Sequence, residues 1–377
     1  MGTRSGRVEA SRVARSVLAV GAAAIGTFCM TLAPVVARDF TAFSRKDRMS
    51  DVAALAPRVD PLLVNPWGIA AGPETALWVN DEGTGVSTVY VGNGLPMPPT
   101  PLVVTVAPPN GTAGPSHPTG IVFSELAASD PTAFVVTNGS ASAPSLFIFV
   151  TLDGTISGWN PGVDLTHSFN GLDNSSTGAV YTGLAIVEDK IFAANFAQNR
   201  LEIYDKNWGF LGLGTDPGLP TDRDWAPFGA WAHEDELYVA FAVRGSDGRA
   251  VREPGLGIVS LFDGDGAFVR RVATGAPLNA PWGMTEAPED FGDFGEAFLV
   301  GNFGDGTINA FDDETGEHLG TLRDFDGNPI VTDGLWGIGF GNGVRSGKTD
   351  RLNFAAGIEN ETHGMLGQFG TRGHSSE

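Results

Sequence analysis

The chain is poor in cysteine and in basic residues. Cys29 is the single cysteine among 377 residues and lies in an apolar run near the start, so the rest of the chain has no disulfide framework, thiol nucleophile or thiolate metal site. Lys and Arg number 23 against 44 Asp and Glu, a formal net charge of −21 at pH 7. Such a surface repels nucleic acid and anionic lipid, so we expect neither as a partner.

Helical periodicity and the short motifs of common enzymes are also missing. Outside the start of the chain, no stretch repeats its apolar residues at the spacing of a helix. The sequence contains no G-x-S-x-G elbow, Walker loop, H-E-x-x-H or dinucleotide fingerprint. These absences indicate an all-β protein and give no motif from which a reaction can be inferred.

Residues 1–37 resemble an export signal. Four arginines precede an apolar run from Ser16 to about Val36, and the run ends in small residues at 35–37. This pattern predicts a cleaved signal peptide and a secreted or extracytoplasmic protein that is free of the membrane. The alternative is an uncleaved anchor, because roughly twenty apolar residues just span a bilayer.

One phrase of sequence recurs along the whole chain. Its glycines are spaced 46 to 63 residues apart, which is typical of an array of supersecondary units with loop insertions. The six copies are NPWGIA at 65–70, HPTGIV at 117–122, YTGLAI at 181–186, APFGAW at 226–231, APWGMT at 280–285 and GLWGIG at 334–339.

Two or three short β-like runs follow each copy of the phrase. In the second repeat, for example, FVVTN at 134–138 is expected as the second strand and SLFIFV at 145–150 as the third. Asp-Gly pairs then predict hairpins to a fourth strand, because glycine supplies the positive φ of the turn. Six such antiparallel four-stranded units arranged radially make a six-bladed β-propeller. We expect one propeller domain over 38–370 and a polar C-terminal tail at 371–377.

The last repeat lacks its outer strand. It stops near Phe369, so we expect an N-terminal segment, 39–43 or 49–55, to complete the last blade and close the ring. The competing architecture has seven blades, with a degenerate one hidden in the interval that follows Gly120.

Several long phrases resemble a known family. The order of Pro-x-Gly-Ile-Ala, a strand that ends in Asn or Asp, and NRLEIYD at 199–205 is similar to the repeat of NHL-type propellers. Over roughly 50–370 the chain resembles a family of uncharacterised secreted bacterial NHL-like proteins, through LVNPWGIA at 63–70, HPTGIVF at 117–123 and ETHGMLG at 361–367. The resemblance implies the propeller fold and export, and it implies no activity.

Polar residues are expected to gather at one mouth of the propeller channel. Loops that enter the innermost strands and loops that leave the second strands share that face. Asparagine recurs there, either as a turn residue that ends a strand or as part of a ring that binds a polar ligand or a cation. The predicted ring consists of Asn65, Asn80, Asn138, Asn195 and Asn302.

Histidines and carboxylates on adjacent blades form a candidate metal site. The candidates are Asp81, Glu82, His117, Glu361 and His363. Two imidazoles with carboxylates suit one divalent metal such as Zn, Mn or Fe, with Ca as a further candidate, or form a general acid and base pair. In the second case His117 and His363 are the catalytic candidates. The alternative is that each histidine is a structural or surface residue.

The tryptophans fall into two groups. Trp67, Trp282 and Trp336 stand in the repeated phrase and are expected to wedge between blades, because buried aromatics supply core area. Trp159, Trp208 and Trp225 are expected in loops, as candidates for stacking on sugars.

Three functions are compatible with these features. The first is a secreted, monomeric binding or scaffold protein that recognises a small molecule, a glycan or a protein with an acidic channel mouth. The second is a metal-dependent hydrolase or lyase of the lactonase or sugar-lyase kind. The third is a purely structural extracellular component. Fold alone does not choose among them.

Overall fold

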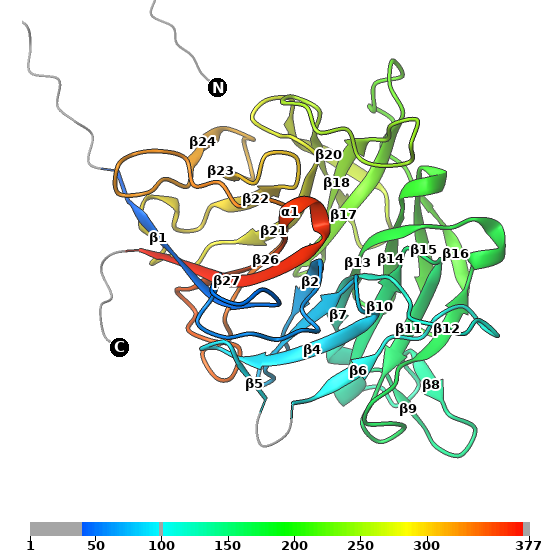
Figure 1. Cartoon of the computed structure of the whole chain (residues 1–377). Helices are drawn as coiled ribbons and strands as arrows, with labels where there is room; N and C mark the ends of the chain where they lie inside the picture. Colours follow the sequence, from blue (N-terminus) through cyan, green and yellow to red (C-terminus); the bar gives the residue numbers. More distant parts are fainter. Residues whose placement is uncertain (1–39, 98–100, 372–377) are drawn as a thin grey trace, which may run out of the picture. The chain divides into compact units, whose positions relative to one another are not determined.

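The computed structural model describes residues 40–97 and 101–371, and their strands form six antiparallel sheets of four or five strands and one small hairpin. Each large sheet is one blade, so the six-bladed β-propeller predicted from the sequence is confirmed (Figure 1). The predicted signal peptide at 1–37 and the tail from 372 onwards lie outside the described residues.

The first three blades follow one another along the chain. Blade 1 consists of β2 (Pro66–Ala70), β3 (Leu77–Asp81), β4 (Val86–Val91), β5 (Leu95–Pro96) and β6 (Val103–Thr105). Blade 2 consists of β7 (Pro118–Phe123), β10 (Phe147–Thr151), β11 (Thr155–Trp159) and β12 (Phe169–Asp173). Blade 3 consists of β13 (Tyr181–Val187), β14 (Lys190–Asn195), β15 (Arg200–Asp205) and β16 (Phe210–Gly214).

The other three blades complete the ring. Blade 4 consists of β17 (Trp225–His233), β18 (Glu236–Val243), β19 (Ile258–Asp263) and β20 (Phe268–Thr274). Blade 5 consists of β21 (Pro281–Glu286), β22 (Phe298–Asn302), β23 (Ile308–Phe311) and β24 (His318–Thr321). Blade 6 consists of β25 (Leu335–Phe340), β26 (Leu352–Gly357), β27 (His363–Thr371) and β1 (Phe43–Ser50).

Helical structure in the described residues is confined to short turns. These are η1 (Glu125–Ala128), η2 (Ser175–Thr177), η3 (Phe196–Gln198), η4 (Gly292–Phe294) and α1 (Ile358–Glu361). None of the helices described is long and apolar enough to cross a membrane.

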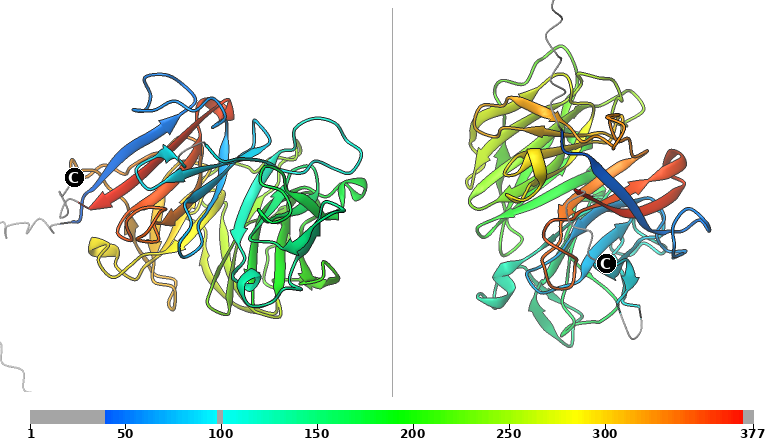
Figure 2. Two further views of the ribbon diagram at one scale, coloured as in Figure 1. Left: turned by 90° about the horizontal axis from the view of Figure 1, so that it is seen from below. Right: turned by 90° about the vertical axis from the view of Figure 1, so that its left-hand side faces the viewer.

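The ring is closed by a strand from the other end of the chain. β1 pairs antiparallel with β27, from Phe43 opposite Thr371 to Ser50 opposite Met365. Figure 2 shows β1, in blue, beside β27, in red, in both views. The expected closure is confirmed, although the strand at 43–50 lies between the two segments proposed for it and overlaps each only at its edge.

The second strand of blade 2 differs from the prediction. The run at 134–138 contributes β8 (Val135–Thr137), which pairs only with β9 (Ser142–Pro144) in a side hairpin. β10 is the strand that pairs with the innermost strand β7. The long interval after Gly120 therefore holds an inserted hairpin and no seventh blade, because β8 is too short to bury a face of its own.

The glycines of the repeated phrase lie where innermost strands of adjacent blades approach each other. These strands are neighbours around the full ring, in the order β2, β7, β13, β17, β21, β25 and back to β2. A Cβ atom on Gly337 would lie 2.6 Å from the backbone oxygen of Trp67 in blade 1. The phrase therefore recurs because the close approach of neighbouring innermost strands leaves no room for a side chain at its glycine.

The hydrophobic core is divided among the gaps between blades. Six of its clusters each join two adjacent blades; the cluster of blades 6 and 1, for instance, contains Met49, Val79 and Leu366. A seventh cluster is aromatic and brings together residues from blades on all sides of the ring axis. The axis of this propeller is thus filled by rings, and this filling forms the floor of the candidate site.

Candidate functional site

A cavity of about 640 Å³ opens at the end of the channel where the innermost strands begin. Its walls come from residues at the start of innermost strands, such as Trp67 and Thr182, and from residues that follow second strands, such as Glu82 and Phe303. This is the face on which the sequence placed the functional loops. We call it the mouth cavity.

Stacked aromatic rings form the floor of the mouth cavity. The rings of Trp67 and Trp336 stack with centroids 3.4 Å apart, and Phe303 stacks on the other face of Trp336 at 3.8 Å. Trp282 meets Trp67 and Trp336 edge-on, and its Nε1 donates to the backbone oxygen of Thr182 in blade 3, 2.9 Å away. The three tryptophans of the phrase are buried as expected, but they fill the channel axis and do not wedge between blades.

Two arginines and a glutamate stand at the rim. Arg249 and Arg252 come from the long loop between β18 and β19, and Glu361 comes from the turn after β26. Arg249 Nη1 lies 3.2 Å from one carboxylate oxygen of Glu361, and Arg252 Nη2 lies 3.4 Å from the other. Burial raises the pKa of Glu361 above its ordinary value, while Arg252 and Arg249 oppose that shift.

The wall that blade 1 provides, next to blade 6, carries an amide and a second carboxylate. Asn65 Nδ2 donates to Glu82 Oε2 at 2.7 Å, and Asn65 Oδ1 accepts from Trp336 Nε1 at 3.3 Å. Asn65 thereby joins the aromatic floor to the carboxylate of Glu82, which lines the cavity. Asn65 and Glu82 were both candidates from the sequence.

The backbone that presents Glu361 is strained. Glu359, Asn360 and Glu361 all have positive φ, at 53°, 57° and 68°. Non-glycine residues in this left-handed region cost of order 1 kcal/mol or more each, and such outliers cluster at functional sites. The strain turns Asn360 and Glu361 to the mouth cavity, which both residues line.

Three of the predicted ring asparagines serve as backbone ties. Asn80 Nδ2 donates to the oxygen of Gly120 in blade 2 at 3.0 Å. Asn195 Oδ1 accepts from the backbone N–H of Val180 at 3.3 Å, and Asn302 donates to the backbone oxygen of Pro277 at 2.8 Å. All three asparagines are fully buried and none lines the mouth cavity. These asparagines join strands and loops, and this is a structural role.

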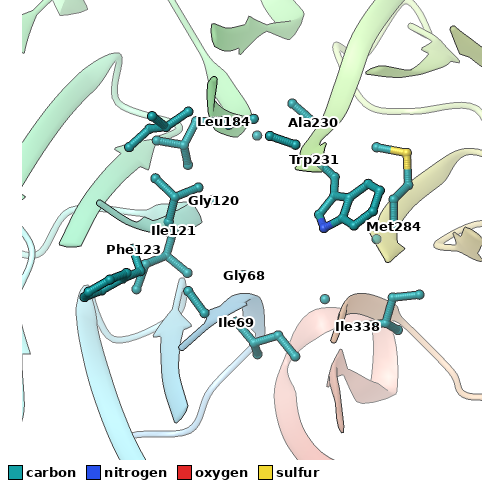
Figure 3. A pocket seen from close by; sticks show the side chains of 18 of the residues that line it. Gly68, Ile69, Gly120, Ile121, Phe123, Leu184, Ala230, Trp231, Met284 and Ile338 are labelled. Atoms are coloured by element: carbon teal, nitrogen blue, oxygen red, sulfur yellow. The ribbon is translucent and has the colours of Figure 1, made fainter. Parts of the chain in front are cut away.

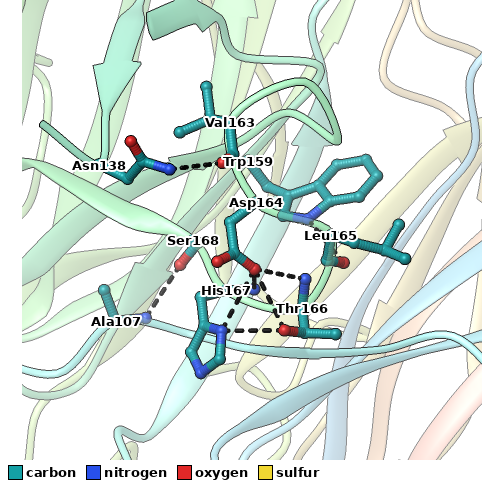
Figure 4. Close-up of polar contacts among 9 residues, drawn as sticks. All are labelled: Ala107, Asn138, Trp159, Val163, Asp164, Leu165, Thr166, His167 and Ser168. Carbon is teal, nitrogen blue, oxygen red and sulfur yellow. Dashed lines mark hydrogen bonds and ion pairs between the residues drawn. The ribbon is translucent and has the colours of Figure 1, made fainter. Parts of the chain in front are cut away.

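Asn138 lies away from the channel. It sits at the turn of the β8–β9 hairpin, and its side chain donates to the oxygen of Val163 at 2.7 Å (Figure 4). Trp159 is buried in β11, where Nε1 donates to the oxygen of Leu165. Trp225 is likewise buried in β17. Because Trp159 and Trp225 are core residues in strands, neither offers a ring face for a sugar.

The remaining candidates from the sequence are held apart from one another. His117 Nδ1 lies 3.0 Å from Asp153, and His363 Nδ1 lies 2.7 Å from Asp51. Neither histidine lines the mouth cavity. Within residues 40–97 and 101–371 no group of three or more His, Cys, Asp or Glu side chains is placed to hold a metal ion. The structure therefore gives each histidine a separate carboxylate partner, and the expected metal cluster is not assembled in this part of the chain.

Asp81 is fully buried below the site. Thr88 Oγ1 donates to one of its carboxylate oxygens at 2.7 Å, while the other oxygen has no partner among the described residues. Burial raises the pKa of Asp81 well above its ordinary value of 3.8. Asp81 is not among the residues that line the mouth cavity, in contrast to its sequence neighbour Glu82.

A second cavity of about 300 Å³ lies at the other end of the channel. The side chains that line it are mostly apolar and come from the innermost strands, with Ile69, Ile121, Leu184, Trp231, Met284 and Ile338 around it (Figure 3). Trp282 lines this cavity and contacts Trp67 and Trp336, which line the mouth cavity. The aromatic cluster thus lies between the two cavities.

Sequence reasoning missed the aromatic floor and the arginines. Phe196 and Phe303 each follow directly after the asparagine that ends a second strand, so the same pattern that marked Asn195 and Asn302 marks them. Arg249 and Arg252 stand close together in an acidic chain, within an insertion between two expected strands. That local concentration of basic residues is the sequence feature from which these arginines could have been predicted as site residues.

Solved structures resemble this propeller distantly. A streptogramin B lyase structure has a TM-score of 0.48 at 12% identity and covers 88% of this chain and 97% of its own. Virginiamycin B lyase from Staphylococcus aureus has a TM-score of 0.48 at 12% identity and covers 87% of this chain and 99% of its own. At this level of similarity no activity carries over to this chain.

Relatives at the sequence level come from a virus, and no protein-family model matches the chain. Uncharacterized protein L690 of Acanthamoeba polyphaga mimivirus is 34% identical over 331 residues, which are 85% of this chain and 83% of L690. Uncharacterized protein R648 of the same virus is 31% identical over 324 residues, which are 83% of this chain and 76% of R648. The chain therefore belongs to the protein family that includes mimivirus L690 and R648.

Proposed function

We propose that this chain is a binding protein that holds a small molecule in the mouth cavity. The observation that carries the proposal is the meeting of a buried aromatic floor with a charged rim in one opening of about 640 Å³. Ligand sites of known proteins have volumes of this order and combine apolar walls with a few convergent polar groups. Each 100 Å² of apolar ligand surface buried there contributes about 2.5 kcal/mol.

The rigidity of the site supports the proposal. Its parts come from several blades, and the floor rings are buried and stacked on one another, so the cavity exists before a ligand arrives. A preformed cavity lowers the entropic cost of binding. Exchange of loop residues changes the ligand without disturbing the blades, which is how propellers serve many recognition functions.

A thermal-shift screen with a blocking variant tests the proposal. A library of neutral, cationic and anionic small molecules is added to the protein, and ligands that bind only the folded state raise its unfolding temperature. Ala250 lines the mouth cavity, so Ala250→Trp fills it and should abolish the shifts. Ala128→Trp is the matched control, because Ala128 is an exposed residue of η1. A screen without hits, or hits that survive in Ala250→Trp, would sink the proposal.

Export and monomeric state complete the proposed function. The arginine-rich start and the apolar run that follows support export, and mass spectrometry of the mature N-terminus tests it. The likeness to bacterial NHL-like proteins supports a bacterial source, whereas the relatives found are viral. Glycan and protein ligands remain alternatives to a small molecule at the same mouth. No contact among the described residues favours a metal-dependent hydrolase or lyase, which stays a prediction.

A further inference from the structure

The rim of the mouth cavity carries two arginines beside three carboxylates, those of Asp247, Glu82 and Glu361. The side chains of Arg249 and Arg252 are 75% and 37% exposed, whereas that of Glu361 is only 16% exposed. The carboxylate thus lies behind the two guanidinium groups. Both guanidinium groups are open to a ligand at this mouth, in a chain that carries 44 acidic residues against 23 basic ones.

Both arginines keep donors for a ligand. Within the described part of the chain, each side chain donates to Glu361 and to no other group. A guanidinium has five N–H donors in a fixed planar arrangement that matches carboxylate, sulfonate and phosphate oxygens. Glu361 contacts both arginines and leaves most of these donors unused.

Arg252 also joins the charged rim to the apolar floor. Its guanidinium carbon lies 4.0 Å from the centroid of Phe303, whose ring stacks on Trp336. This cation–π contact fixes the charge directly above the aromatic stack. The faces of Trp336 are covered on both sides by Trp67 and Phe303, so the floor offers ring edges and a narrow apolar wall. A sugar needs an open ring face for stacking, whereas an apolar body packs against ring edges as well.

We propose that the mouth cavity selects organic anions that have a flat apolar body. The apolar body packs on the aromatic floor, and the acidic group binds Arg249 and Arg252. This inference rests on the proposed function, because it names the ligand class of the same cavity. The ligand is recognised by charge-assisted hydrogen bonds at one end and by burial of apolar surface at the other.

Three probes that share a naphthalene ring and differ in charge test whether the cavity selects anions. Naphthalene-2-sulfonate, the neutral naphthalene-2-sulfonamide and the cationic naphthalen-2-ylmethylammonium are titrated into the full chain by isothermal titration calorimetry at pH 7. The sulfonate is expected to bind roughly tenfold or more tightly than the sulfonamide, since charged hydrogen bonds are stronger than neutral ones. The cation is expected to bind most weakly.

Variants of the two arginines locate the selectivity. Arg249→Gln and Arg252→Gln should each weaken the sulfonate by roughly tenfold and leave the sulfonamide within about twofold. Arg323→Gln is the matched control, because Arg323 is exposed and its Nη1 donates to the oxygen of Gly327, in the loop between β24 and β25. Circular dichroism and urea unfolding show whether each variant keeps its fold.

The outcomes separate the two proposals. Preference for the sulfonate that is lost in both cavity variants and kept in Arg323→Gln supports anion selection. Anion selection is overturned if the three probes bind equally, if the cation binds best, or if the preference is unchanged in both arginine variants. Each of these results still leaves a cavity that binds small molecules. Failure of all three probes, together with an empty thermal-shift screen, overturns both.

Discussion

At the scale of single residues, Asp81 couples stability to pH. Its pKa is raised by burial above the 3.8 of an ordinary carboxyl, so the folded state keeps a proton that the unfolded state loses. Between the two pKa values stability therefore falls as pH rises, by about 1.4 kcal/mol per pH unit. At neutral pH Asp81 works against the fold.

Asp81→Asn is expected to stabilise the protein at neutral pH. The amide keeps the side-chain size and still accepts the hydrogen bond of Thr88, while it has no charge to bury. Urea unfolding from pH 4 to pH 8 should show a gain that grows with pH. Asp326→Asn removes an exposed carboxyl and serves as the control for net charge. A gain that is the same at every pH would contradict the assignment.

Glu361 should make anion binding depend on pH. It competes with a ligand for Arg249 and Arg252, and its pKa is raised by burial, with Glu82 adding to the shift. Glu359 and His363 are the other titratable groups of its own segment. As pH falls through the raised pKa, Glu361 becomes neutral and releases the arginines. The affinity for naphthalene-2-sulfonate, which stays ionised, should therefore increase.

Glu361→Gln should bind this sulfonate roughly tenfold more tightly at pH 7 and with a flatter pH profile. Calorimetric titrations at pH 5, 6 and 7 measure both effects. Glu314→Gln, an exposed residue of the hairpin between β23 and β24, should leave the profile of the native protein unchanged. Weaker binding by Glu361→Gln would mean that Glu361 positions the arginines and does not compete with the ligand.

At the scale of elements, the approach of neighbouring innermost strands depends on glycine. Gly337→Ala in β25 places a methyl group against the backbone oxygen of Trp67, which has no side-chain freedom to move away. The expected loss is about 1–3 kcal/mol, as for other overpacked sites. Gly212→Ala in β16 is the matched control, because no heavy atom lies within 4 Å of its added carbon. Urea unfolding should separate the two variants, and equal stability would refute the close approach.

Elements were predictable where the chain repeats itself. The phrase at 65–70 and its copies identify each innermost strand, since a glycine at that position meets the same steric demand in each blade. The inserted hairpin of blade 2 was not predictable, because the run FVVTN at 134–138 has the composition and length of the runs that form second strands, although only three of its residues form β8. Only pairing with β7 distinguishes β10 from β8, and pairing is a long-range property.

At the scale of the whole molecule, the ring depends on β1. Phe43 of β1 is 1% exposed and packs with Phe291 and Phe294 of blade 5. Phe43→Ala should lower the free energy of unfolding by about 3–5 kcal/mol. Phe210→Ala in β16 is the control, because Phe210 is 60% exposed and should change stability by less than about 0.5 kcal/mol. Urea unfolding measures both, and a Phe43→Ala protein as stable as the control would show that β1 does not hold the ring.

The sequence by itself determined the all-β class, the six repeats and the closure by an N-terminal strand, because each follows from local patterns that physical constraints impose on every blade. It also placed Asn65, Glu82 and Glu361 on the face of the mouth cavity. The tertiary structure alone decided which polar groups meet. His117 and His363 lie beside different aspartates, and Arg249 and Arg252 reach Glu361, more than 100 positions along the chain. Which side chains come into contact depends on the conformation of the loops and on how the rings stack at the axis. A local sequence pattern determines neither.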